Sequence, residues 1–293
     1  MAKLSIQNLS KTYPNGVKAL DNVSLEISNG MFGLLGPNGA GKSSLMRTLA
    51  TLQEADRGSA FLNDLDILNK PSELRKVLGY LPQEFGVYPR ITAGQLLDHV
   101  ATLKGVSNKK ERKELVDYLL QKVNLYDKRN KSVKGFSGGM KQRVGIAQAL
   151  IGNPQLIIVD EPTAGLDPGE RNRFHNLLAD VGENVVVILS THIVDDVREL
   201  CSNMAIMNHG RIVYAGTPDT VLGELKGKVW VKTIARDEVE VYKTQHHVIS
   251  DKMVAGQPQI HIFSDTNPGD GFIPVEPNLE DVFFVKIHSA VNA

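Results

Sequence analysis

One segment strongly constrains the fold of this chain, the glycine-rich run Gly36-Pro37-Asn38-Gly39-Ala40-Gly41-Lys42-Ser43. It matches the pattern G-x-x-x-x-G-K-[ST] of a phosphate-binding P-loop. An apolar run at 31–35 precedes it, and a helical pattern from residue 42 to about 52 follows it. Strand, loop and helix in this order are the context that the motif requires. The sequence therefore predicts a domain that binds a nucleoside triphosphate.

The chemistry of this loop predicts how the phosphates are held. Its three glycines lack a Cβ, so the backbone can curl closely around phosphate oxygens and present its N–H groups to them. The helix that follows adds its N-terminal dipole. Lys42 is expected to reach the β- and γ-phosphates, and the hydroxyl of Ser43 to coordinate Mg²⁺. Ser44 is expected as the next residue of the helix and is counted with the nucleotide-binding loop.

Composition and charge narrow the class of protein. The 293 residues suffice for one large domain and a small one, and 42% hydrophobic with 23% charged residues suit a soluble globular protein. The formal net charge is zero and no basic stripe is evident, so no nucleic-acid partner is expected. The single cysteine, Cys201, allows no internal disulfide and fits a reducing cytoplasm. We expect it to be a small core residue on a helix.

The sequence offers no candidate for a membrane-spanning segment. No apolar run reaches the ~18 residues of a spanning helix. The best candidate, 185–189, has only the length of a strand. The N-terminus lacks the basic-then-apolar pattern of a signal peptide. We therefore expect a polypeptide that does not cross a membrane by itself.

The order of periodic segments predicts an α/β fold. Polar and apolar residues alternate at 3–9 and at 19–27, which predicts half-buried strands of an antiparallel sheet. Strands and helices alternate later in the chain, which predicts a parallel sheet covered by helices. Further strands are expected at 31–35, 60–62, 76–81, 156–159, 185–189, 205–207 and 211–215, and helices at 91–104, 109–123, 139–150, 168–181 and 193–201, with a last helix opened by Thr217 and Pro218.

The character of the sequence changes near Gly227. Alternating segments separated by Gly and Pro predict a small β-rich region, closed by a short helix at 279–287. Its strands are expected at 228–234, 239–242 and 259–263. We therefore divide the chain into a nucleotide-binding domain at 1–225 and a C-terminal accessory α+β region at 226–293.

A pair of carboxylates ends the apolar run at 156–159. A buried strand that ends in Asp160 places a carboxylate at the carboxyl edge of the sheet, beside the P-loop, where it can hold Mg²⁺. Glu161 is one residue further on, so it points elsewhere and is a candidate to polarise an attacking water. The alternative for Glu161 is a charge at the N-terminus of the next helix.

The segment Ser137-Gly138-Gly139-Met140-Lys141-Gln142-Arg143 predicts a second anion site. Ser137 is a candidate N-cap, and the glycines leave backbone amides open at the start of a helix. Taken alone, the segment is equally consistent with a plain capped helix.

Together, these motifs resemble those of the nucleotide-binding subunits of ATP-binding cassette (ABC) transporters. The resemblance covers roughly residues 2–225 and makes 36–43 the Walker A loop, 137–140 the signature and 156–160 the Walker B strand. The signature of the family usually begins Leu-Ser-Gly-Gly, and here Phe136 replaces the leucine. The fold that the family implies is a RecA-like P-loop core with an antiparallel β subdomain and an α-helical subdomain, here about 86–150, to which this chain adds a small β-rich C-terminal appendage.

The resemblance also assigns roles to single residues. Tyr13 matches the aromatic residue that stacks on adenine, and Gln83 matches the glutamine that touches the metal and the water and senses the membrane partner. Glu161 becomes the catalytic base, and His192 matches the switch histidine that contacts the γ-phosphate. Asp167 ends the D-loop, 164–167, and joins the nucleotide site. The plainer alternatives are a strand-end aromatic for Tyr13, a turn residue for Gln83 and a structural histidine for His192.

The resemblance implies cofactors and partners. ATP and Mg²⁺ are the expected cofactors, with Ser43, Gln83 and Asp160 as the metal set. Two such subunits, identical or different, would pack head to tail, so that Ser137, Gly138 and Gly139 of one close over the ATP of the other. A separately encoded polytopic permease would dock on the region from 84 to about 132, which includes Tyr88-Pro89-Arg90, at an apolar cleft between the helical and core parts. The chain would then be peripheral on the inner face of the cell membrane.

A short C-terminal motif suggests a branch of the family. Leu279-Glu280-Asp281-Val282-Phe283 resembles the ending of the drug- and antibiotic-resistance export ATPases. The main alternative is a soluble, non-transport ABC ATPase, for example of the cluster-assembly type, which does not explain this motif. A P-loop kinase or GTPase leaves 137–143 and His192 unexplained. The pair His246-His247 lacks further ligands at metal-binding spacing and is expected on a surface strand or loop.

Overall fold

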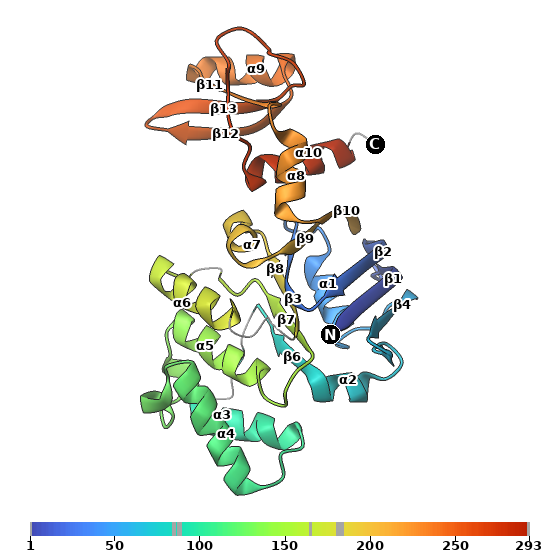
Figure 1. The fold of residues 1–293 in the computed structure, drawn as a ribbon, viewed down its shortest axis with the longest axis vertical. Coiled ribbons are helices and arrows are strands. Elements are labelled where there is room, and N and C mark those ends of the chain that lie inside the picture. Colours follow the sequence, from blue (N-terminus) through green and yellow to red (C-terminus); the bar gives the residue numbers. More distant parts are fainter. Residues whose placement is uncertain (1, 84–85, 87–89, 164–165, 180–184, 292–293) are drawn as a thin grey trace.

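The computed structural model describes residues 2–83, 86, 90–163, 166–179 and 185–291. These residues form three sheets with their covering helices (Figure 1). In the part of the chain that is described, no helix combines the length and the apolar character needed to span a bilayer.

An antiparallel sheet forms the first part of the chain, with strand order β2-β1-β4-β5. Its strands are β1 (Lys3–Thr12), β2 (Lys18–Ser28), β4 (Arg57–Leu62) and β5 (Leu65–Asp66). Leu4, Ile6 and Leu9 of β1 are buried on one face, where they pack with helix α1 (Lys42–Leu49). The predicted antiparallel subdomain is therefore present.

A mostly parallel sheet forms the centre, with strand order β10-β9-β3-β8-β7-β6. Its strands are β3 (Gly30–Leu35), β6 (Leu78–Leu81), β7 (Leu156–Asp160), β8 (Val186–Thr191), β9 (Asn203–Asn208) and the antiparallel edge strand β10 (Arg211–Gly216). Every residue of β7 and β8 is buried, as expected for strands covered on both faces. Leu35 pairs with Thr191, and Asp160 pairs with Ser190. The carboxyl ends of β3, β7 and β8 therefore lie side by side.

Three helices of the core start close to where they were predicted: α6 (Pro168–Ala179), α7 (Val194–Leu200) and α8 (Pro218–Leu225). A further helix, α2 (Pro71–Val77), was not predicted. The side chain of Thr217 caps α8, with Pro218 in the first turn, as predicted. The strand predicted at 76–81 begins only at Leu78, because α2 continues to Val77. The last predicted residues of the helix at 168–181 lie outside the described residues.

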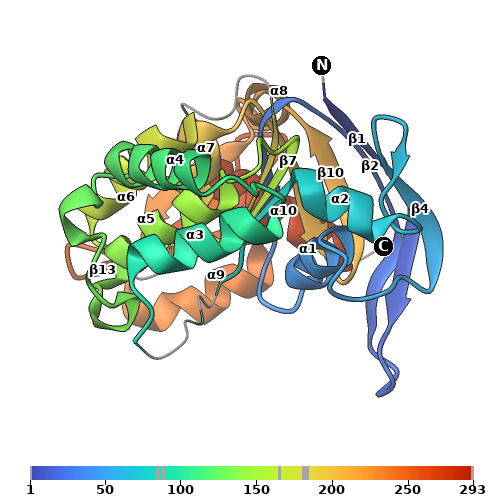
Figure 2. The ribbon, with the colours of Figure 1, turned by 90° about the horizontal axis from the view of Figure 1, so that it is seen from below.

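A helical subdomain lies at one end of the molecule, on the side away from the antiparallel sheet (Figures 1 and 2). It consists of α3 (Ala93–Leu103), α4 (Lys109–Lys122) and α5 (Gly138–Ala149). These helices share an apolar cluster that is separate from the core of the sheet. Thr92 and Gln95 form a capping box at α3, and Asn108 caps α4, which defines where both helices begin.

The C-terminal region contains a small sheet of order β12-β13-β11-β14 at the other end of the molecule (Figure 1). Its elements are β11 (Val229–Thr233), α9 (Val239–Gln245), β12 (Val248–Val254), β13 (Gln257–Phe263) and β14 (Ile273–Pro274). The final helix α10 (Leu279–Val291) returns to the core around the central sheet and packs against α7, α8 and β10.

One prediction in this region is wrong and two strands were missed. Residues 239–242 form the start of helix α9, because Val239 and Tyr242 face the same apolar cluster at helical spacing while Val241 is 49% exposed. The missed strands are β12 and β14, which form the two edges of the sheet. Strand β12 exposes most of its side chains, so its sequence shows no apolar alternation, and β14 is only two residues long.

Candidate functional site

A pocket of about 460 Å³ lies at the carboxyl ends of β3, β7 and β8. It brings together most of the residues predicted for a nucleotide site, from five separate stretches of the chain. Its walls include Tyr13, Pro37, Asn38, Gly39, Ala40, Gly41, Lys42, Ser43, Ser44, Gln83, Glu161, His192 and His209. Parallel sheets bind ligands at this edge, where strand order places loops from different strands side by side.

The P-loop adopts its shape because glycine is required where it meets β2. Gly41 has a φ of 107°, and a Cβ there would lie 2.3 Å from the carbonyl oxygen of Ala19. The side chain of Lys42 is 5% exposed, and its Nζ atom donates to the carbonyl oxygens of Gly36 at 2.7 Å and Pro37 at 3.3 Å. The buried ammonium thus lies inside the loop where phosphate oxygens are expected.

Glu161 joins Lys42 and His192 in one cluster. Its Oε1 atom lies 3.4 Å from Nζ of Lys42, and its Oε2 atom forms a short contact with Nδ1 of His192. Glu161 has a φ of 51°, a left-handed conformation that is uncommon outside glycine, and its N–H donates to the carbonyl of Ser190.

Asp160 has the chemistry of a cation ligand. Among the described residues its buried Oδ1 atom has no hydrogen-bond partner. Burial raises the pKa of its carboxyl group, an effect that the neighbouring hydroxyls of Ser190 and Ser43 partly offset. A carboxylate and a hydroxyl oxygen side by side are ligands that Mg²⁺ prefers. The residues present therefore fit a magnesium ion held by Ser43 and Asp160.

Tyr13 is held against the first helix by its hydroxyl group. The hydroxyl lies 3.0 Å from Oγ of Ser44 and donates to Oε1 of Gln53 at 3.0 Å. Nε2 of Gln53 in turn donates to the carbonyl of Ser44 and to Oγ1 of Thr48. These hydrogen bonds therefore hold the aromatic ring of Tyr13 in place in the wall of the pocket. Sequence reasoning missed Gln53, which follows the helix in no recognisable motif.

Comparison with known proteins identifies the family. The family model described as ABC transporter matches residues 20–164. The daunorubicin/doxorubicin resistance ATP-binding protein DrrA of Streptomyces peucetius is 31% identical over 267 residues, which cover 90% of this chain and 78% of that protein. The chain belongs to the ABC transporter family. ATP-binding domains of this family are ATPases, so this chain binds and hydrolyses ATP.

Two further comparisons support and limit this assignment. The methionine import ATP-binding protein MetN of Clostridioides difficile is 36% identical over 235 residues, which cover 76% of this chain and 72% of that protein. A solved structure described as a dimeric post-hydrolysis state of the ATP-binding cassette MJ0796, bound to ADP and Pi, matches with a TM-score of 0.66 at 27% identity, over 73% of this chain and 98% of that one. The relatives thus include both resistance and import proteins.

The signature segment of this ABC ATPase lies outside the pocket. Ser137 caps α5, as predicted, and accepts a hydrogen bond from the N–H of Met140 at 3.2 Å. A Cβ on Gly139 would lie 2.5 Å from the carboxylate of Glu170, so a larger residue there would require the Glu170 side chain to move. Neither of these residues nor Gly138 lines the pocket around Lys42. The expectation that one monomer cannot place both motifs on one nucleotide agrees with this arrangement.

The remaining predicted site residues have local structural roles in the ABC ATPase. Oδ1 of Asp167 accepts from the N–H of Glu170 at 2.9 Å and so caps α6, and the residue is not among those lining the pocket. Phe136, which replaces the usual leucine, is buried in the apolar cluster of the helical subdomain. Ala164, Gly165, Tyr88 and Pro89 lie outside the described residues.

His209 was missed by the sequence reasoning. It lies in the turn between β9 and β10 with a φ of 45° and lines the pocket beside the P-loop. The turn is attached to the loop because the N–H of Gly210 donates to the carbonyl of Ala40 at 2.8 Å. An Asn-His-Gly sequence between two predicted strands was the signal for a tight turn. Nothing in that signal places the turn beside the P-loop.

Proposed function

We propose that this chain is the ATPase subunit of an ABC transporter that works with a second ATPase subunit and a separately encoded polytopic permease. The observation that carries the proposal is the cluster of Lys42, Glu161 and His192 at the P-loop, with the signature segment outside that pocket. A site divided in this way is completed by a second subunit. Attached to such a permease, the chain would act in the cytoplasm at the inner face of the cell membrane.

Each part of the pocket then has a role in phosphoryl transfer. The amides of the P-loop and Lys42 bind the β- and γ-phosphates, and Tyr13 stacks on adenine. When ATP enters, its phosphate oxygens take the place of the loop carbonyls and Glu161 around the ammonium. Ser43, Asp160 and Gln83 hold Mg²⁺, which neutralises charge on the phosphates when bound.

Glu161 is positioned to act as the general base. It accepts a proton from the attacking water, and His192, which contacts Glu161 directly, orients that carboxylate and meets the γ-phosphate. Ser137, Gly138 and Gly139 of the second subunit donate to the same phosphate from the N-terminus of α5. Asp167 lies at the junction between the two subunits. ATP therefore joins the subunits, and hydrolysis releases them.

The direction of transport is proposed as export. The resistance protein DrrA aligns over 90% of the chain, and the motif at 279–283 matches the ending of that branch. The import protein MetN is a relative as well, so support for export comes from the motif and the longer alignment. Docking of the permease is proposed on the helical subdomain, where a hollow between α3 and α4 is lined by Val116 and Leu120 together with basic residues.

We also propose that the chain has two functional parts, 1–225 and 226–293. The sheet of the second part has its own apolar cluster, which includes Trp230, Tyr242 and Phe272. Helix α10 connects the parts, because Leu279, Val282 and Phe283 pack in the same core as α7 and β8.

Two measurements test the proposal. The ATPase rate of the purified chain should rise more steeply than linearly with protein concentration, and addition of ATP to the Glu161→Gln variant should produce a dimer. Purification of the tagged chain from its native membrane should yield a polytopic membrane protein. A linear rate together with a monomeric Glu161→Gln variant would contradict the shared site. Recovery with a soluble assembly partner would favour the non-transport alternative.

A further inference from the structure

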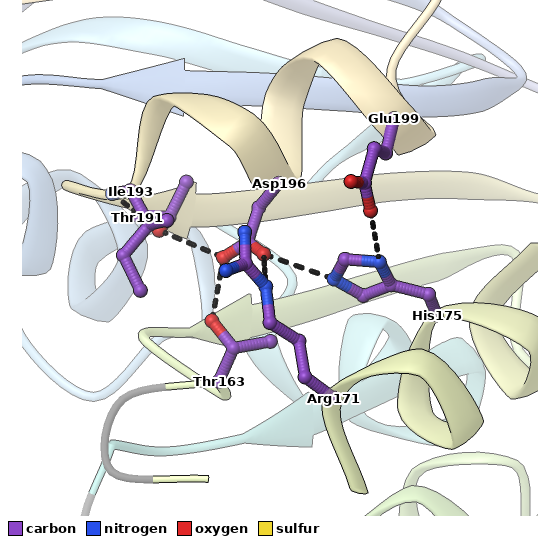
Figure 3. A network of polar contacts seen from close by, with 7 residues as sticks. All are labelled: Thr163, Arg171, His175, Thr191, Ile193, Asp196 and Glu199. Carbon is purple, nitrogen blue, oxygen red and sulfur yellow. Dashed lines mark hydrogen bonds and ion pairs between the residues drawn. The ribbon is translucent and has the colours of Figure 1, made fainter. Parts of the chain in front are cut away.

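One buried carboxylate connects the two loops that carry Glu161 and His192. Asp196 in α7 is 0% exposed and accepts hydrogen bonds from side chains on three other segments (Figure 3). Its Oδ2 atom lies 2.5 Å from Oγ1 of Thr163 and 3.3 Å from Oγ1 of Thr191. Its Oδ1 atom lies 2.7 Å from Nε of Arg171 and 2.9 Å from Nε2 of His175.

The two threonines on Oδ2 belong to the loops of the active pocket. Thr163 follows Glu161 by two residues, and Thr191 directly precedes His192. Oγ1 of Thr191 also accepts from the N–H of Ile193 at 2.9 Å, so the chain is held on both sides of His192. A single carboxylate oxygen therefore ties the loop of Glu161 to the loop of His192.

Helix α6 supplies the charge that this carboxylate needs. A buried charge is costly unless it is paired and hydrogen-bonded. Arg171 supplies the opposite charge at Oδ1, and the imidazole of His175 adds a hydrogen bond there. Nδ1 of His175 lies 2.9 Å from the carboxylate of Glu199, which fixes the ring from its other side. The pairing anchors Asp196 firmly enough that Oδ2 can hold both hydroxyls in place.

We propose that Asp196 is a positioning residue that sets the geometry between Glu161 and His192 and thereby the rate of ATP hydrolysis. The inference rests on the proposed roles of these two residues. Asp196 acts on them through its hydrogen bonds to Thr163 and Thr191. Small displacements of reacting groups reduce turnover strongly, so loss of either hydroxyl should lower the rate without weakening ATP binding.

Matched substitutions of the two threonines test the proposal with little risk to folding. Thr163→Val and Thr191→Val remove the hydroxyl at nearly constant volume, whereas Thr163→Ser and Thr191→Ser keep it. We expect each valine variant to lower kcat by roughly ten- to a hundredfold with KM for ATP changed less than about twofold. The serine variants should keep most of the wild-type kcat. The double valine variant should lose less than the product of the single effects, because both hydroxyls act through one carboxylate.

Further variants separate positioning from a general loss of structure. Asp196→Asn should lower kcat at least as much as either valine variant. Thr102→Val removes a hydroxyl that bonds the carbonyl of Asp98 on α3, far along the chain from these loops, and should leave kcat unchanged. When combined with Glu161→Gln, the valine substitutions should not change the ATP concentration at which the dimer forms.

Two outcomes would overturn the inference. One is an unchanged kcat in both valine variants, even if their melting temperature falls, because Asp196 would then be a purely structural clamp. The other is a rise in KM with unchanged kcat, which would assign the hydroxyls to ATP binding. If Glu161→Gln is inactive, either of these results rejects only the role of Asp196 and leaves the proposed function intact. If Glu161→Gln is active, the proposed function itself is contradicted.

Discussion

The ammonium of Lys42 lies 3.4 Å from the carboxylate of Glu161, and both side chains are almost completely buried. The same carboxylate contacts His192 through its second oxygen. The residue proposed to bind phosphate and the residue proposed to activate water are therefore each other's ion-pair partner. Because phosphate and Glu161 compete for one ammonium, a change at Glu161 should affect ATP binding and hydrolysis in opposite directions.

Replacement of Glu161 by glutamine tests this competition. Glu161→Gln removes a negative charge beside the phosphate site, so we expect ATP affinity to stay at the wild-type level or to increase by a few-fold. Loss of the base should lower turnover by at least about a hundredfold. Nucleotide titration and single-turnover hydrolysis measure the two effects. Wild-type turnover in this variant would show that Glu161 is not the base.

The buried carboxylate of Asp160 should lower the free energy of unfolding of the protein in the absence of Mg²⁺. Burial raises its pKa above the ordinary 3.8, so its contribution to stability is present at low pH and is lost as the pH rises through the raised value. In Mg²⁺-free buffer at neutral pH, Asp160→Asn should raise the free energy of unfolding by about 1 kcal/mol, or the melting temperature by roughly 2–4 °C.

The same variant should lose Mg²⁺-dependent ATP hydrolysis, because the amide is a poor replacement for a carboxylate ligand. The stability advantage of Asp160→Asn should shrink as the pH falls through the raised pKa, and thermal scans across a pH series measure it. Lower stability of Asp160→Asn at neutral pH would contradict the unpaired state of Oδ1.

The hydroxyl of Tyr13 should contribute to ATP binding only by holding the ring in place. Tyr13→Phe keeps the ring but loses the bonds to Ser44 and Gln53, so we expect the Kd for ATP to rise by about two- to fivefold. Tyr13→Ala removes the stacking surface as well and should raise the Kd by at least about tenfold. Equal effects of both variants would show that the hydroxyl itself binds the nucleotide.

Cys201 offers a test of how tightly α7 is packed. The thiol is buried beside Asp196, and burial raises its pKa to about 12. Because the thiolate is the reactive form, the folded protein should react with thiol reagents very slowly at pH 8 and should label quickly in denaturant. As the only cysteine in the chain, Cys201 gives an unambiguous signal. Rapid labelling of the native protein would contradict the buried position.

Helix α10 should stabilise the ATPase core although it ends the chain. Phe283 packs in the core cluster that contains Val197 of α7 and Leu189 of β8. Phe283→Ala should lower the free energy of unfolding by about 3 kcal/mol, because it leaves a cavity in that cluster. Met253→Ala, at a side chain that is 55% exposed in β12, is the control and should change stability by less than about 0.5 kcal/mol. Chemical denaturation measures both.

Strongly periodic segments were predictable, and weakly periodic ones were not. The strands before the P-loop and before Asp160, and the caps Thr217 and Ser137, lie where local patterns placed them. The segment 239–242 was misassigned because Val-Glu-Val-Tyr satisfies both strand alternation and a single helical turn. Only burial of Val239 and Tyr242 on one side distinguishes the two.

The sequence alone determined the P-loop, because its eight residues are contiguous and their chemistry is local: glycines that allow close approach, a lysine and a hydroxyl in fixed order. Tertiary structure decided which distant residues meet that loop. The parallel order β3-β8-β7 places Glu161 and His192 beside Lys42, and the β9–β10 turn adds His209. It also buries Asp196 between the two loops. Such contacts depend on strand order and register across the sheet, which no single segment of sequence encodes.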